Sequence, residues 1–125
     1  MEKNNNLNKD LNEINSKEKQ LNNTIFYINK YSNWLFDLLN SFTEENIQEY
    51  LKEFNSINQQ LLEIKKNEIN SKLKTELMAI IIILLADIDL LLEKLKKKKY
   101  SHLNKKYEKE FKNIKKQLDN YIFFL

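Results

Sequence analysis

The chain has 125 residues, of which 42% are hydrophobic and 31% charged, and its formal net charge is +3. Gly, Pro, Cys, Arg and Val are all absent. Because tight turns rely on Gly and many loops on Pro, a β-sheet protein is improbable. The lack of Cys excludes disulfides and thiolate metal sites, and the lack of Gly excludes a phosphate-cradling loop. The first ten residues, "MEKNNNLNKD", contain no apolar core of a signal peptide, so we expect a cytoplasmic protein.

Apolar residues recur at helical spacing along the whole chain. In the first run, apolar residues alternate in steps of four and three, interrupted only by Glu18, as in the seam of a coiled coil: Leu7, Leu11, Ile14, Leu21, Ile25 and Ile28. Three further runs begin at Ile47, Leu73 and Leu103. We expect helices near 5–41, 44–67, 71–98 and 102–124, with residues 1–6 frayed because Asn is a poor helix former.

Polar segments separate these runs. In "NSFTEEN" (residues 40–46), Ser41 or Thr43 can cap a new helix, and Asn70 or Ser71 offers the next cap. The sequence therefore predicts an all-α fold in a single domain, 1–125, built as an antiparallel helical bundle of three to four long helices with coiled-coil-like packing. If residues 65–72 do not break the helix, the alternative is a longer three-helix hairpin that dimerises.

The segment "LMAIIIILLADIDLLLEKLKKKK" (residues 77–99) is the most apolar part of the chain. Residues 77–92 extend about 24 Å as a helix, less than the ~30 Å hydrocarbon core of a bilayer. Asp87 and Asp89 would add up to about 3 kcal/mol each near the centre of a membrane span. A buried bundle helix fits better than a span or an interfacial helix. Because residues 77–86 are apolar nearly all round, we expect extra cover from another subunit or a partner.

Three parts of the sequence are candidates for partner binding. They are the apolar run, the aromatic cluster "YSNWLF" and the apolar C-terminus "YIFFL", although aromatic residues at helical spacing more often belong to a core. The candidate partner-binding residues are Ile80, Leu84, Ile88, Leu91, Trp34, Tyr121, Phe123 and Phe124.

A basic segment follows the apolar run. Residues 94–116 hold eleven Lys and two Glu, whereas residues 1–93 are net acidic. The segment has three interpretations: a solvated helix face in a lysine-rich sequence, a contact for an anionic membrane surface, or a nucleic-acid contact that lacks Arg for base reading. The candidate contact residues are Lys96, Lys97, Lys98, Lys99, Lys105 and Lys106.

No pattern in the sequence points to catalysis, so we predict that the protein is not an enzyme and needs no cofactor or metal. His102 is the only histidine, and its spacing to acidic residues suggests no partner. Asp87 and Asp89 are two residues apart, which directs their side chains to different sides of a helix.

In size, in its Asn-rich start "MEKNNNLNKDLNEIN" and in the apolar run followed by lysines, "AIIIILLADIDLLLEKLKKKK", the chain resembles the prophage holin-accessory (haemolysin-accessory) proteins of spirochaete plasmids. The resemblance implies a small helical protein that supports a small membrane holin. The leading hypothesis is thus a non-catalytic accessory or scaffold protein that associates with itself or with another helical protein, at most peripheral to the inner membrane face. The alternatives are a non-specific nucleic-acid-binding protein and a holin-like membrane-active protein.

Overall fold

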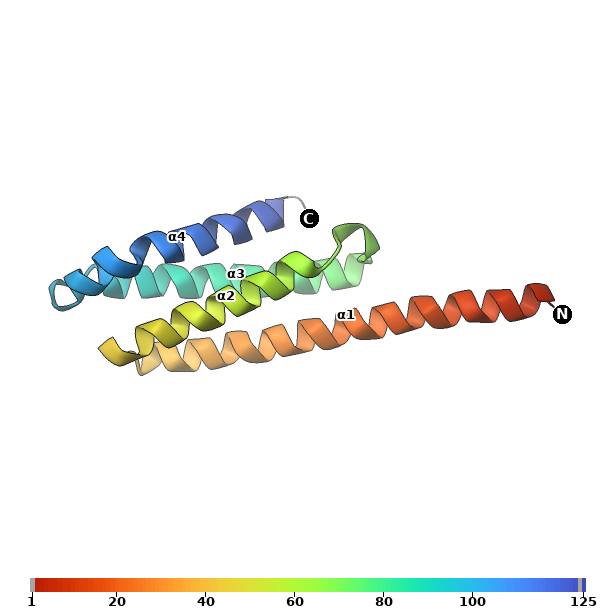
Figure 1. Cartoon of the computed structure of the whole chain (residues 1–125), viewed down its shortest axis with the longest axis horizontal. Helices are drawn as coiled ribbons and strands as arrows, with labels where there is room; N and C mark the ends of the chain where they lie inside the picture. Colours follow the sequence, from red (N-terminus) through yellow and green to blue (C-terminus); the bar gives the residue numbers. More distant parts are fainter. Residues whose placement is uncertain (1, 124) are drawn as a thin grey trace.

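The protein folds as a bundle of four α-helices (Figure 1). The computed structural model describes residues 2–123 and 125, with the side chains of 16–123 and 125. The helices are α1 (Glu2–Asn40), α2 (Ile47–Glu63), α3 (Ser71–Leu95) and α4 (Ser101–Phe123), and the described residues form no strand. The predicted all-α bundle is confirmed.

The three connections are short and each contains one turn of 3-10 helix: Glu44–Asn46, Lys66–Glu68 and Lys98–Tyr100. The helix is interrupted between α2 and α3, so the alternative of a three-helix hairpin is wrong. Ile64 and Asn70 adopt extended backbone conformations there, and the Asn70 side chain accepts a hydrogen bond from the Leu73 amide at 2.9 Å. Asn70 is therefore the N-cap, one of the two caps that the sequence offered.

The helix boundaries differ from the expected ones by a few residues. Residues 2–6, expected to be frayed, are assigned to α1, and adding residues to an existing helix costs far less than starting one. Met1 lies outside the described residues. The helix α3 ends at Leu95 and not near residue 98, since Lys97 is extended at the start of the last connection.

Each helix packs on two others. The helices α1 and α4 both contact α2 and α3, which leaves α1 diagonal to α4 and α2 diagonal to α3. The helices α1 and α3 run in the same direction, as do α2 and α4, while each sequential pair is antiparallel (Figure 1). The two hairpins α1–α2 and α3–α4 therefore lie against each other, and the N-terminal part of α1 extends beyond the ends of the other helices (Figure 1).

The core is continuous along the bundle and is built mainly from the predicted seams. Phe54 of α2 and Phe111 of α4 are fully buried, with their rings edge to face and centroids 6.1 Å apart. The side chains of Leu7, Leu11 and Ile14, which begin the first seam, lie outside the described ones. Among the described residues, no helix is both long and apolar enough to cross a membrane.

Candidate interaction surface

One face of α3 belongs to the core and the other does not. The core-facing side chains Leu84, Ile88 and Leu91 have no exposed surface, and Ile80 is also buried. Their prediction as partner-binding residues is therefore a mistake, because α1 and α4 already cover them. The surplus of apolar residues in this helix lies on its opposite side.

The outward side of α3 carries exposed apolar side chains over three helical turns. The exposed fractions are 39% for Met78, 56% for Ile82, 42% for Ile83 and 45% for Leu90. Ala79 and Ala86, the two alanines of the chain, are exposed between them. We call this surface the α3 outer face: Met78, Ala79, Ile82, Ile83, Ala86 and Leu90. From residue 78 to residue 90 it is about 18 Å long.

Apolar and charged residues border the α3 outer face on its two sides. On the side of α1, Phe26 is well exposed beside a hollow of about 450 Å³ that Ala79 also lines. On the side of α4, Asp89 forms an ion pair of 2.5 Å with Lys115. The face is thus open to solvent, continues into apolar surface toward α1 and is bordered by a charged pair toward α4; exposed apolar patches of this kind are typical of protein-binding surfaces.

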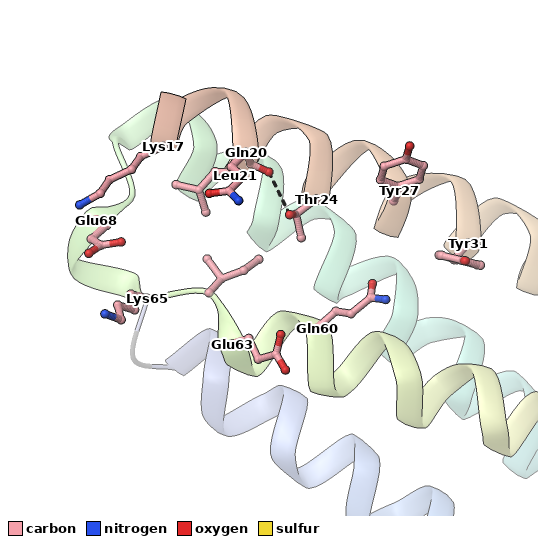
Figure 2. A pocket seen from close by; sticks show the side chains of 11 residues that line it. Lys17, Gln20, Leu21, Thr24, Tyr27, Tyr31, Gln60, Glu63, Lys65 and Glu68 are labelled. Carbon is pink, nitrogen blue, oxygen red and sulfur yellow. Dashed lines mark hydrogen bonds between the residues drawn. The ribbon is translucent and has the colours of Figure 1, made fainter. Parts of the chain in front are cut away.

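A second exposed region lies between α1 and α2, where the two helices diverge. A hollow of about 590 Å³ opens there, and Figure 2 shows Tyr27 and Tyr31 along α1 and Gln60 and Glu63 on α2 around it. Trp34 lines an adjoining hollow with Glu53 and is partly exposed. The structure leaves Trp34 accessible to solvent, and its role in partner binding stays a prediction.

The C-terminal candidates are divided between core and surface. Tyr121 is buried, its hydroxyl donates to the Ile64 carbonyl at 3.3 Å, and Lys66 Nζ lies 4.4 Å from its ring centroid. It closes the end of the bundle and is not a partner-binding residue, which corrects the prediction. Phe123 is 82% exposed, and Phe124 lies outside the described residues.

The predicted contact lysines gather around the connection from α3 to α4. All six of them are exposed: Lys96, Lys97, Lys98, Lys99, Lys105 and Lys106. Lys99 and Lys106 lie over the rings of Tyr100 and Tyr107, at 4.8 and 5.2 Å. Lys94 faces inward instead and donates to the Leu39 carbonyl at the end of α1.

His102 has a partner that its sequence position did not reveal. Its Nε2 lies 2.5 Å from Glu44 of the α1–α2 connection, 58 residues away, and both side chains are more than half exposed. The pair joins the two hairpins at one end of the bundle. Among the described residues, no three His, Cys, Asp or Glu side chains are grouped as metal ligands.

A buried carboxylate is the feature that sequence reasoning missed. Asp87 is 3% exposed, and burial raises the pKa of its carboxyl to about 6. The contacts Asn70–Glu18 and Lys94–Leu39 join residues 52 and 55 positions apart, which places Asp87 at the height of residues 32–35 of α1. That segment contains the buried Ser32, whose hydroxyl, like Asp87 Oδ2, has no hydrogen-bond partner among the described residues.

Comparisons with known proteins leave the surface to be interpreted from its own chemistry. No protein-family model, no curated protein and no solved structure matches the chain.

Proposed function

We propose that the protein is a non-catalytic helical accessory or scaffold protein that works by association, and that the α3 outer face is its main contact surface. The observation that carries this proposal is the exposure of Ile82, Ile83 and Leu90 along one side of α3. Fully burying such a side chain is favourable by about 1.5–3 kcal/mol, and because these are about half exposed, a partner that covers them gains roughly 1 kcal/mol from each.

The chemistry of the face favours an apolar helix as the occupant. It is narrow, about 18 Å long and formed by one helix, so a second helix laid along it would meet successive turns. Through the resemblance to holin-accessory proteins, we further propose that the physiological partner is a small membrane protein of the holin type. The exposed lysines around residues 96–106 would then lie against anionic lipid beside that partner.

Vesicle flotation tests the proposal. Purified protein is mixed with phosphatidylglycerol-containing vesicles, either empty or carrying a reconstituted single-helix holin-type protein. We expect recovery with the vesicles only when the membrane protein is present. Salt-insensitive recovery with empty vesicles would contradict the accessory function and favour a holin-like, membrane-active protein.

A pair of matched variants locates the contact. Ile82→Glu places a charge on the α3 outer face, whereas Leu62→Glu places the same charge on α2 at a leucine that is 49% exposed. We expect Ile82→Glu to lower recovery at least tenfold and Leu62→Glu to leave it within twofold. Equal effects of the two changes would remove the α3 outer face from the proposal.

The cluster of exposed lysines also supports a second candidate function, non-specific binding of nucleic acid through phosphates. A gel shift at low salt decides between the two, because phosphate contacts made by these lysines would weaken steeply as salt is added. The absence of a shift at low salt would eliminate this candidate.

A further inference from the structure

The exposed residues at the centre of α3 follow the same pattern in both directions along the helix. Reading forward from residue 79, they are Ala79, Ile82, Ile83 and Ala86, and reading backward from residue 86 gives the same residue types at the same spacing. At about 100° per residue, the two alanines lie within about 20° of each other on the midline of the face. Ile82 and Ile83 lie about 50° to either side of that midline.

From this symmetry we propose that the α3 outer face binds a second copy of the chain, with the two α3 helices antiparallel. The inference rests on the proposed function, in which the chain associates through this face, and gives the face a second occupant: another copy of the chain, which the helix of a membrane partner must displace. A two-fold axis passes beside α3 between Ile82 and Ile83. Ala79 of one copy then faces Ala86 of the other, and the four isoleucines pack around the axis. In such a two-fold interface each contact occurs twice, so a pattern that reads identically in both directions is self-complementary.

The alanines set how close the two helices come. Interaxial distances between packed helices are 8–10 Å and depend on the side chains at the contact. With only methyl groups on the midline, the two α3 backbones approach to about 8 Å, and the isoleucines fill the space at either side. A face meant only for lipid needs neither the small midline residues nor the symmetry.

The charges at the ends of the face agree with the antiparallel pairing. Lys72 and Glu93 are both exposed, and their positions are symmetric about the same axis. Each Lys72 therefore meets a Glu93 of the other copy, once at each end of the contact. Glu76 of one copy and Asp89 of the other also come to the same height along the dimer. On α3 these two positions lie about 140° apart around the helix axis, so the two carboxylates stay on opposite edges of the contact.

Cysteine cross-linking tests this register directly, because the protein contains no natural cysteine. In the proposed dimer, a cysteine at position 79 faces a cysteine at position 86 of the other copy. Within one chain these positions are about 10.5 Å apart, beyond the ~7 Å limit between Cα atoms for a disulfide. We therefore expect mildly oxidised Ala79→Cys/Ala86→Cys protein to form a covalent dimer.

The single variants are matched controls. Ala79→Cys alone and Ala86→Cys alone keep their cysteines about 10.5 Å apart in the dimer and are expected not to cross-link, whereas an equimolar mixture of the two forms a disulfide-linked heterodimer. Cross-linking of each single variant with itself would show parallel pairing and overturn the proposal. Failure of the double variant and of the mixture to cross-link would also overturn it.

Light scattering with charge reversal provides a second test that leaves the apolar residues unchanged. We expect the natural chain to elute as a dimer at 100 μM. Lys72→Glu or Glu93→Lys alone should raise the dimer dissociation constant several-fold, and the double exchange should restore it. A monomer at 100 μM would overturn the inference, but the proposed function survives that result if Ile82→Glu still abolishes flotation with the membrane protein.

Discussion

The helices α3 and α4 pack against each other and bury similar seams, yet their outward sides are opposite in character. Along α4 the outward positions include Lys105, Lys109, Lys112 and Lys116, which are all exposed. Along α3 the corresponding stretch presents isoleucine, leucine and alanine to solvent. Since both inward faces serve the same core, the difference between the outward faces is not required by folding. The seams of both helices stabilise the fold, and the proposed association rests on one side of α3.

The largest expected effect comes from breaking the seam of α4. Phe111→Ala removes a fully buried ring from its edge-to-face contact with Phe54, and we expect it to lower the free energy of unfolding by about 3–5 kcal/mol. Urea denaturation measures the change, followed by the fluorescence of Trp34, the single tryptophan.

The matched control for this prediction is an apolar truncation on the outward side of α3. Ile82→Ala removes side-chain atoms that are already more than half exposed, so it should change the unfolding free energy of the monomer by at most about 1 kcal/mol. The measurement is made at a protein concentration low enough to keep the chain monomeric. A loss as large as that of Phe111→Ala would mean that the outward side of α3 supports the fold itself.

The sequence predicted α2 and α4 well because each has a narrow apolar seam with polar flanks. For α4, the seam residues Leu103, Tyr107, Phe111, Ile114 and Leu118 are all buried. The seam of α3 that begins at Leu73 is buried as well, so the pattern also indicates which side of α3 faces the core. Because residues 77–86 are apolar nearly all round, the sequence does not separate core positions from surface positions there, and Ile80, Leu84, Ile88 and Leu91 are predicted to bind a partner although they are buried in the bundle.

The two aspartates of α3 illustrate the same limit. Their spacing showed that they point in different directions, but the sequence did not show that α1 would cover one of them. Asp87 became buried at the height of Ser32, while Asp89 remained exposed beside Lys115. Which side of a helix a neighbour covers depends on the order of helices around the bundle, and the connection lengths alone do not determine that order.

The second prediction concerns pH and the buried Asp87. Its pKa of about 6 in the folded chain is above the ordinary 3.8, so the folded state holds this proton more tightly than the unfolded state. Its contribution to stability is fully present below about pH 4 and is lost as the pH rises through 6, for a total of up to about 3 kcal/mol. We expect Asp87→Asn to remove this part of the pH dependence.

The measurement compares unfolding free energies of the natural chain and Asp87→Asn from pH 4 to pH 8. The variant should gain stability relative to the natural chain as the pH rises, and the change should be concentrated between pH 4.5 and 7. Asp89→Asn is the control, because it makes the same change at an exposed aspartate of the same helix. A difference between the natural chain and Asp87→Asn that stays constant with pH would contradict a buried, titrating Asp87.

The smallest expected effect on folding comes from Asp89, the acidic residue on the edge of the α3 outer face. Its hydrogen bond and charge raise the pKa of Lys115, but both partners are substantially exposed. Asp89→Asn should therefore lower the unfolding free energy by no more than about 1 kcal/mol.

The effect of Asp89→Asn on self-association should be opposite in sign to its effect on folding, because the change removes a carboxylate that must be partly desolvated when a second α3 covers the face. Sedimentation equilibrium of the variant should show a lower dimer dissociation constant, whereas Glu110→Gln, a change at an exposed acid of α4, should leave it unchanged. Weaker association of Asp89→Asn would mean that this carboxylate makes a favourable contact in the dimer, and that the charged edge of α3 takes part in binding as well as its apolar centre.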